Sequence, residues 1–338
     1  MINWLNLTEE QRKLSLEQAA LKLGTIPKAI EKDWWVTLTL KALFETPFKT
    51  ELIFKGGTSL SKCWKLIDRF SEDIDIAMSP TLFGMEYHES PGSGYLNRLK
   101  RRGCAFTSNE LKNALEKQFE ILGLPKDSVE VVAGEIPENM KDKDPQELFI
   151  RYKSLFDPNP YLLDEVKIEV SVRSKLEPYT GVAITSLLQE YFPNEAYNDE
   201  PFIVLAVEPH KTFLEKAFLL HEQFHRDEET VIKTDRMSRH YHDLVKMQDT
   251  EVCERALNDS DLYVAIVKHR SYYNKLKGLD YKSLQRDKID FVPPNEMIEA
   301  YQKDYEAMRE NMIYGESVDP KKLFEKIGKL KELFRNVK

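Results

Sequence analysis

The sequence contains few cysteines and no long apolar run. Its three cysteines, Cys63, Cys104 and Cys253, are odd in number and far apart, which argues against a disulfide framework or a cysteine zinc knuckle and is typical of a reducing compartment. No stretch approaches the roughly 18 consecutive apolar residues of a membrane span, and the N-terminus lacks the basic and apolar regions of a signal peptide. We therefore expect a cytoplasmic protein with no membrane partner.

An excess of positive charge is also absent. The 49 Lys and Arg against 57 Asp and Glu give a net charge of −8, so any site for a polyanion must be local. Only 13 glycines and 16 prolines occur, with 41% hydrophobic and 31% charged residues, which indicates a folded globular chain rather than a disordered one. At roughly 100–200 residues per domain, the 338 residues predict about two domains.

The hydrophobic pattern changes along the chain. Residues 1–50 show helical spacing, in which Thr8 and Gln11 resemble a capping box. Residues 51–207 mix strand-like alternation with helical spacing, and residues 208–338 are helical throughout. Ser79–Gly103 holds four glycines and a basic run, which predicts a long mobile loop or insertion. The order predicts an N-terminal helical segment, a core of strands and helices, and a helical C-terminal domain.

A glycine pair separates a predicted strand from a predicted helix. Glu51–Lys55 has the pattern of a strand, Gly56-Gly57 that of a turn and Ser59–Ile67 that of a helix. The backbone N–H groups of such a turn suit phosphate binding, with Ser59 and Lys62 close by. Glycines at a strand-to-helix turn are also often only structural, so this signal alone leaves the function open.

Two carboxylates follow on the next predicted strand. Asp73 and Asp75 alternate with isoleucines, which places both acids on one face and both isoleucines in the core. Val166–Val172 repeats the pattern and offers Glu169 as a third acid. Adjacent carboxylates suit a pair of hard divalent cations in nucleotidyl transfer, and the alternative is a solvated strand edge.

Five segments occur in order over roughly residues 28–250: Ile30–Trp35, Gly56–Lys62, Arg69–Ile76, Pro209–Ala217 and Arg236–Leu244. Together they resemble the motifs of a known family, the AbiEii/AbiGii-type nucleotidyltransferase toxins of the DNA polymerase β-like superfamily. It implies an α+β fold, with a polymerase β-like core of a mixed sheet and flanking helices over residues 51–207 and a helical C-terminal domain over 208–338. The nucleotide is expected in the cleft between them.

The resemblance assigns roles to individual residues. Those that would act in catalysis are Asp73, Asp75, Glu169, Lys216 and Asp243, and the metal ligands among them are Asp73, Asp75 and Glu169. Those that would bind the nucleotide are Gly56, Gly57, Thr58, Ser59, Lys62, Arg69, Lys216 and Arg239. Spacings of three and four on one helix put Arg239 and Asp243 on one face, where Asp243 would orient Lys216 or Arg239.

The implied reaction is transfer of a nucleoside monophosphate from a nucleoside triphosphate to an acceptor hydroxyl, with two Mg²⁺ ions or Mn²⁺ as cofactor. The implied acceptor is tRNA, the implied partner a cognate antitoxin, and the implied setting a toxin–antitoxin or phage-defence (abortive infection) system. The basic run, formed by Arg98, Lys100, Arg101 and Arg102, is either a solvated loop or a contact for the RNA acceptor.

Alternative functions remain open on the sequence. In one the chain is a protein nucleotidylating enzyme, whose acceptor is a protein hydroxyl, and in another it is a catalytically silent nucleotide-binding module. His221-Glu222-Gln223-Phe224-His225 matches the HExxH pattern of zinc proteases. Arg69 is either a nucleotide contact or a buried ion-pair partner of the Asp73–Asp75 strand. Residues 31–33 (Glu-Lys-Asp) are expected to form a structural network beneath the site.

Overall fold

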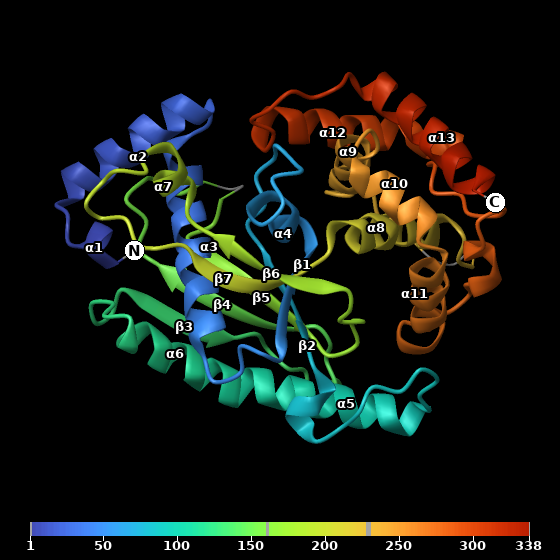
Figure 1. Ribbon diagram of the computed structural model, residues 1–338, viewed down its shortest axis with the longest axis horizontal. Coiled ribbons are helices and arrows are strands. Elements are labelled where there is room, and N and C mark those ends of the chain that lie inside the picture. Colours follow the sequence, from blue (N-terminus) through green and yellow to red (C-terminus); the bar gives the residue numbers. More distant parts are fainter. Residues whose placement is uncertain (1, 160–161, 228–230, 338) are drawn as a thin grey trace. The chain divides into compact units, whose positions relative to one another are not determined.

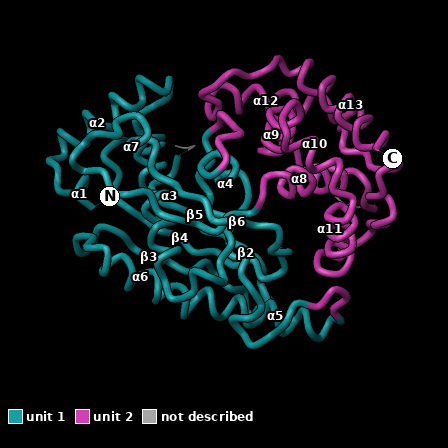
Figure 2. The backbone as a smooth tube through the Cα atoms, viewed as in Figure 1, with its two compact units in different colours: residues 1–63, 70–87, 92–207 teal, residues 64–69, 88–91, 208–338 magenta. Residues whose placement is uncertain are grey.

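The computed structural model describes residues 2–159, 162–227 and 231–337, and the chain divides into two compact units, coloured separately in Figure 2. Unit 1 comprises residues 1–63, 70–87 and 92–207, and unit 2 comprises residues 64–69, 88–91 and 208–338. The N-terminal helices therefore group with the sheet, and two short segments from the first third of the chain group with the C-terminal helices.

Unit 1 is built on a mixed seven-stranded sheet in the order β3-β4-β5-β2-β1-β7-β6. Its strands are β1 (Leu52–Lys55), β2 (Ile74–Met78), β3 (Val129–Ala133), β4 (Gln146–Tyr152), β5 (Glu165–Ser171), β6 (Tyr179–Ile184) and β7 (Phe202–Val207). Strand β2 pairs parallel with β5 and antiparallel with β1, while β1 pairs parallel with β7. The unit is thus a mixed α/β structure with a mixed sheet, as expected for an α+β protein.

Alternation along the central strands explains which face carries polar groups. Ile74 and Ile76 in β2 are fully buried, whereas Asp75 between them is partly exposed. In β5 the buried positions are Val166, Ile168 and Val170, and the residues between them are partly exposed. The predicted period-two pattern is therefore confirmed, and one face of this sheet region is lined by charged side chains.

Three helices precede the sheet in the chain: α1 (Ile2–Leu5), α2 (Glu9–Leu23) and α3 (Pro27–Glu45). The predicted capping box of α2 is present, since the Gln11 amide donates to the Thr8 hydroxyl at 3.2 Å and the Thr8 amide to the Gln11 side chain at 3.0 Å. Helix α3 crosses the sheet (Figure 1) and is buried along nearly its whole length. Charged side chains on α3 must therefore find partners inside the unit.

The segment expected to be a long mobile loop or insertion is helical over residues 80–83 and 93–103, so the loop prediction is wrong there, whereas residues 84–92 lie outside helices. Helix α5 (Ser93–Phe106) contains the basic run, and it continues through a π-helical turn (Thr107–Leu111) into α6 (Lys112–Ile121). Gly103 is buried against Val172, and a Cβ atom at Gly103 would lie 2.4 Å from the Val172 Cγ1 atom. This glycine permits close helix–sheet packing rather than a flexible loop.

The remaining helices of unit 1 are α4 (Gly56–Lys62), which follows β1 directly, and α7 (Leu187–Tyr191). Unit 2 is helical, as predicted, with α8 (Pro209–Phe224), α9 (Ser238–Met247), α10 (Glu251–Asn258), α11 (Ser260–Tyr273), α12 (Ile298–Asn311) and α13 (Pro320–Asn336). Aromatic rings join these helices, such as Tyr241 with Phe324 at 5.3 Å between ring centroids. In the described part of the chain, no helix has both the length and the apolar character to cross a membrane.

Candidate active site

The three predicted carboxylates gather on one face of the unit 1 sheet. Asp75 and Glu169 are register partners on the parallel strands β2 and β5, so their side chains share a face on adjacent strands. Asp73 directly precedes Ile74, the partner of Ile168, and lies on the same side of the chain as Asp75. The structure therefore brings together the acids that the sequence pattern placed on two separate strands.

The charged face extends across four strands. Lys55 of β1 is the register partner of Asp75, and Glu147 of β4 is the register partner of Glu169. Neighbouring carboxylates in such a row repel one another unless a cation lies among them. In this structure one such cation is Lys167, whose Nζ atom lies 2.5 Å from the Glu169 Oε1 atom.

The surroundings of Lys167 keep it protonated. Burial favours the neutral amine, but the hydrogen bond to Glu169 and the charges of Asp73 and Glu147 outweigh burial, so the pKa of Lys167 is raised above its ordinary value. Lys167 and Glu169 each retain 29% of their side-chain exposure, so water reaches both groups. The electrostatics of this face therefore depend on Lys167 as well as on the acids.

Gly56 closes one side of the carboxylate face. Its φ of +81° lies in the left-handed region, and a Cβ atom there would lie 2.0 Å from the Asp75 Oδ2 atom. Only glycine fits this position without moving the carboxylate, because it has no Cβ and adopts positive φ at little cost. The turn and Asp75 are thus packed directly against each other.

The donor set fits a hard divalent cation, since Mg²⁺ and related ions prefer carboxylate oxygens. Asp75 and Glu169 are adjacent in register, and Gly56 leaves Asp75 the room that a side chain would take. No group of three or more His, Cys, Asp or Glu side chains is arranged to bind a metal ion within residues 2–159, 162–227 and 231–337. Glu169 is instead paired with Lys167.

Thr58 and Ser59 are buried rather than presented at the surface. The Thr58 hydroxyl donates to the Asp73 carbonyl oxygen at 2.5 Å, which fixes the backbone at the start of the carboxylate strand. The Ser59 hydroxyl has no hydrogen-bond partner among the described residues. Of the predicted phosphate turn, Gly56 and Gly57 are the more accessible part.

Lys62, which is expected to neutralise the triphosphate, is buried in this structure and pairs with Asp33. Its side chain is 5% exposed, and its Nζ atom lies 2.6 Å from the Asp33 Oδ1 atom on α3. Asp33 also accepts the Leu187 amide at 2.7 Å. Lys62 belongs to the last turn of the short helix α4, and its contact with Asp33 joins that turn to α3.

The charged residues at the start of α3 form the expected structural network. Lys32 pairs with Glu72 at 3.2 Å, and Glu31 accepts the Ser154 hydroxyl at 2.6 Å. Burial is the largest influence on Glu31 and raises its pKa, against these hydrogen bonds. Glu31 and Lys32 are buried, and the ion pair of Lys32 with Glu72 fixes the segment that directly precedes Asp73.

A second charged cluster lies within unit 2, around Asp243 of α9. The Arg69 guanidinium binds Asp243 through two bonds, Nε to Oδ1 at 2.7 Å and Nη2 to Oδ2 at 2.8 Å. The Lys216 ammonium of α8 lies 2.8 Å from Asp243 Oδ2. Arg69 is therefore a partner of Asp243, and because it is 2% exposed it supports the cluster from inside.

The Asp243 cluster has a distinct protonation pattern. Burial opposes ionisation of Asp243, but Arg69 and Lys216 outweigh it and hold its pKa well below the ordinary range. Burial lowers the pKa of Lys216, while Asp243 acts in the opposite direction. His240 lies 3.4 Å from Lys216 through Nδ1, and burial followed by the Lys216 charge keeps its pKa well below the ordinary value.

The cluster carries more positive than negative charge. Arg69, Lys216 and Arg239 provide three cations, and Asp243 is the carboxylate that binds two of them. The Arg239 Nε atom is buried with no hydrogen-bond partner among the described residues. Such an excess of desolvated positive charge is suited to an anion such as phosphate. Of the two partners expected for Asp243, Lys216 or Arg239, Lys216 is the one in contact with it in this structure.

Sequence reasoning missed two members of these sites. No role was expected for Lys167 of the Val166–Val172 segment or for His240 of the Arg236–Leu244 segment. The signal for Lys167 was its spacing of two from Glu169, which puts both on one strand face. The signal for His240 was its spacing of three from Asp243 on one helix.

The HExxH segment does not have the geometry of a zinc site. The His221 Nδ1 atom accepts the Asp290 amide at 2.9 Å, and its Nε2 atom lies 2.8 Å from the Ser283 hydroxyl. Glu222 is bound by the Arg270 guanidinium through both oxygens. Both imidazole nitrogens and the carboxylate are thus engaged in structural contacts, which does not fit the zinc-protease alternative.

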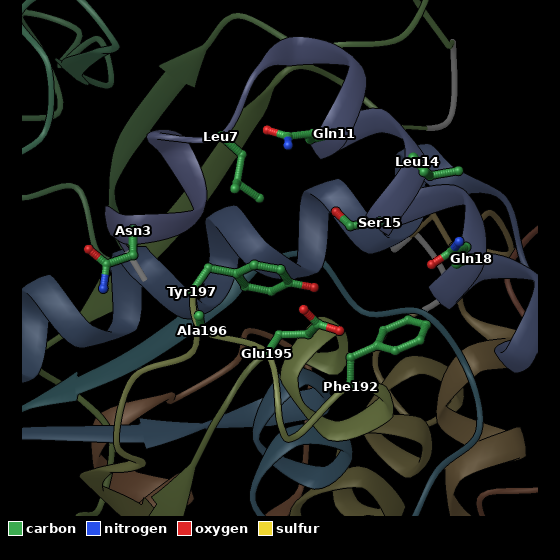
Figure 3. Close-up of a pocket in the computed structure, with 10 residues that line it drawn as sticks. All are labelled: Asn3, Leu7, Gln11, Leu14, Ser15, Gln18, Phe192, Glu195, Ala196 and Tyr197. Atoms are coloured by element: carbon green, nitrogen blue, oxygen red, sulfur yellow. The ribbon is translucent and has the colours of Figure 1, made fainter.

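Unit 1 also contains a surface pocket of about 470 Å³ formed by α1, α2 and the segment after α7 (Figure 3). Its lining includes Phe192 and Tyr197, with amide side chains such as Gln11 and Gln18. None of the predicted site residues lines this pocket. The carboxylate face and the Asp243 cluster therefore remain the candidates for chemistry.

Comparison with known proteins agrees with the motif analysis. Searches of curated proteins and of solved structures gave no match. The family described as nucleotidyl transferase AbiEii toxin, type IV toxin–antitoxin system, matches residues 39–327, which include the carboxylate face and the Asp243 cluster but begin after the Ile30–Trp35 segment. The chain therefore belongs to the AbiEii family of nucleotidyl transferase toxins.

Proposed function

We propose that this protein transfers a nucleoside monophosphate from a nucleoside triphosphate to an acceptor hydroxyl, with Mg²⁺ held at the carboxylate face of a polymerase β-like core. The observation that carries the proposal is the register pairing of Asp75 with Glu169, with Asp73 on the same face and Gly56 packed against Asp75. Family membership supports the reaction class.

The metal ligands in this proposal are Asp73, Asp75 and Glu169. Two Mg²⁺ ions, or Mn²⁺ in their place, would neutralise phosphate charge and lower the pKa of the acceptor hydroxyl. The acceptor oxygen forms a bond to the α-phosphorus, the bond from that phosphorus to the bridging oxygen of the β-phosphate breaks, and pyrophosphate leaves. The acceptor proton passes to a neighbouring carboxylate or to water.

The chain's own residues prepare this chemistry. Thr58 fixes the backbone of Asp73, and Gly56 leaves space for the Asp75 carboxylate. Lys216 and Arg239 offer positive charge for phosphate, and Asp243 orients Lys216 through its 2.8 Å contact. The buried, unpartnered Arg239 Nε atom supports an anionic ligand for that cluster.

We further propose tRNA as the acceptor and a cognate antitoxin as the partner that counters the activity, in keeping with a type IV toxin–antitoxin family. The polyanionic acceptor requires local positive charge on a chain whose net charge is −8. Helix α5 supplies such charge in Arg98 and Arg101, which are exposed.

The test is labelled transfer. Purified protein with Mg²⁺ is incubated with each of four α-³²P nucleoside triphosphates, total RNA and lysate protein, and the products are resolved on denaturing gels. Asp73→Ala removes a metal ligand, and the matched control Asp199→Ala removes a partly exposed unit 1 aspartate that pairs with Lys41. We expect label in tRNA-sized bands with wild type and the control, and none with Asp73→Ala.

The other outcomes separate the alternatives. Label in protein bands alone would replace the tRNA acceptor by a protein hydroxyl. Nucleotide binding without label transfer would identify a silent nucleotide-binding module and overturn the proposed reaction. Equal labelling by wild type and Asp73→Ala would remove the carboxylate face from the mechanism.

A further inference from the structure

The carboxylate face contains its own cation. Lys167 projects from β5 on the same face as Glu169, and its Nζ atom is 2.5 Å from the Glu169 Oε1 atom. Asp73 and Glu147 also attract this ammonium. A charge-assisted hydrogen bond of this length occupies a carboxylate oxygen that a metal ion would otherwise bind.

We propose that Lys167 is a built-in counter-cation of the carboxylate face, which holds the acids together without metal and must leave Glu169 before a divalent cation binds there. This inference rests on the proposed metal site. Three acids without a cation repel one another, and the ammonium relieves that repulsion. Lysine suits the role because it is a point charge on a flexible four-carbon stem.

The exposure of the pair permits the exchange. Both side chains are 29% exposed, so the ammonium can move into water while a cation takes its place. The cost of displacing Lys167 lowers the affinity of the nucleotide-free protein for a divalent cation. A substrate that carries its own phosphate charge offers the displaced ammonium a new partner, which couples metal binding to nucleotide binding.

The experiment measures Mn²⁺ binding to nucleotide-free protein, by the electron paramagnetic resonance signal of unbound Mn²⁺. Lys167→Met removes the charge, and Lys167→Arg keeps it. The matched control is Lys112→Met, because Lys112 also belongs to unit 1, forms a 2.6 Å ion pair with Glu116 and is 26% exposed. Thermal melting confirms that each variant is folded, and Lys167→Gln replaces Lys167→Met if the latter does not fold.

We expect Lys167→Met to bind Mn²⁺ about tenfold more tightly or better than wild type, a change typical of altering a group beside a metal site. Lys167→Arg and Lys112→Met should bind as wild type does, and adding Asp75→Asn to Lys167→Met should abolish the gain. Unchanged affinity in folded Lys167→Met, including no binding by either protein, would overturn the counter-cation role.

Failure of the two proposals can be told apart. If labelled transfer depends on Asp73 but Mn²⁺ affinity is unchanged in Lys167→Met, the reaction stands and the role of Lys167 is overturned. If Mn²⁺ affinity rises as expected, and does so only when Asp75 is intact, while no nucleotide is transferred, the counter-cation stands and the proposed reaction fails.

Discussion

Gly56 shows how one residue determines the geometry of the carboxylate face. We predict that Gly56→Ala greatly reduces nucleotide transfer, because its Cβ would lie 2.0 Å from the Asp75 Oδ2 atom and push the carboxylate away. A displacement on the order of 1 Å at a reacting centre costs about 100-fold in rate. The measurement is labelled transfer alongside urea unfolding.

Gly84→Ala is the matched control for this substitution. Gly84 also has positive φ, at +61°, but a Cβ there meets no atom within 4 Å. Gly84→Ala should lose roughly 1–2 kcal/mol of stability for an alanine in the left-handed region, and Gly56→Ala should lose at least as much because of the added contact with Asp75. Only Gly56→Ala should lose transfer, and equal transfer by the two variants would contradict the role given to Gly56.

At the scale of elements, helices α3 and α4 are joined by the buried pair of Asp33 and Lys62. We predict that Lys62→Met and Asp33→Asn each destabilise the fold by about 3–5 kcal/mol, because each leaves a buried charge without its partner. The double variant should recover much of that loss. Urea unfolding of the four proteins forms a double-mutant cycle that measures the coupling.

The same cycle tests whether Lys62 meets the nucleotide. If its role is to join the helices, labelled transfer should return in the double variant together with stability. A stable double variant with no transfer would instead restore the direct phosphate role predicted from the sequence. Lys41→Met is the control, because Lys41 lies on α3 like Asp33, pairs with Asp199 and is 17% exposed. Removing this more exposed ion pair should lower the free energy of unfolding by less than removing the pair of Asp33 and Lys62.

Alternation predicted the strands β2 and β5 and the polar positions of Asp75 and Glu169 within them, because a strand period of two is a local property. The parallel pairing that brings the two acids together is not local, and only the structure shows it. The basic segment was misjudged because Gly103 looked like a loop residue, whereas it is required by contact with Val172. That contact joins residues far apart in sequence. The ion pair between Lys62 and Asp33 could not be predicted for the same reason, since the two residues lie 29 positions apart.

At the scale of the whole molecule, the two charged clusters differ in how predictable they were. The carboxylate face comes from neighbouring strands within unit 1, whereas the Asp243 cluster joins Arg69 to a residue 174 positions later. Residues 64–69 group with unit 2, whereas residues 70–76 of the same motif group with unit 1. No local pattern specifies such a grouping, although the motif order had marked both residues.

The Asp243 cluster should also determine the acid stability of the protein. The folded-state pKa of Asp243 lies below its ordinary value of 3.8, because Arg69 and Lys216 outweigh burial. Its ionised form therefore contributes stability that is fully present above the unfolded pKa and is lost as pH falls below about 4 toward the folded pKa. We predict that Asp243→Asn costs about 3–5 kcal/mol at pH 7.

The difference in free energy of unfolding between wild type and Asp243→Asn should become smaller by about 1 kcal/mol as the pH is lowered from 5 to 3, because protons then bind Asp243 in the unfolded wild type. Urea unfolding at each pH measures it. Asp249→Asn is the control, because Asp249 is 75% exposed and pairs with Lys326 at the surface, so its stability should change by less than about 1 kcal/mol. If the difference in free energy of unfolding between wild type and Asp243→Asn does not change with pH, Arg69 and Lys216 do not hold Asp243 ionised. That result would contradict the charge pattern assigned to this cluster.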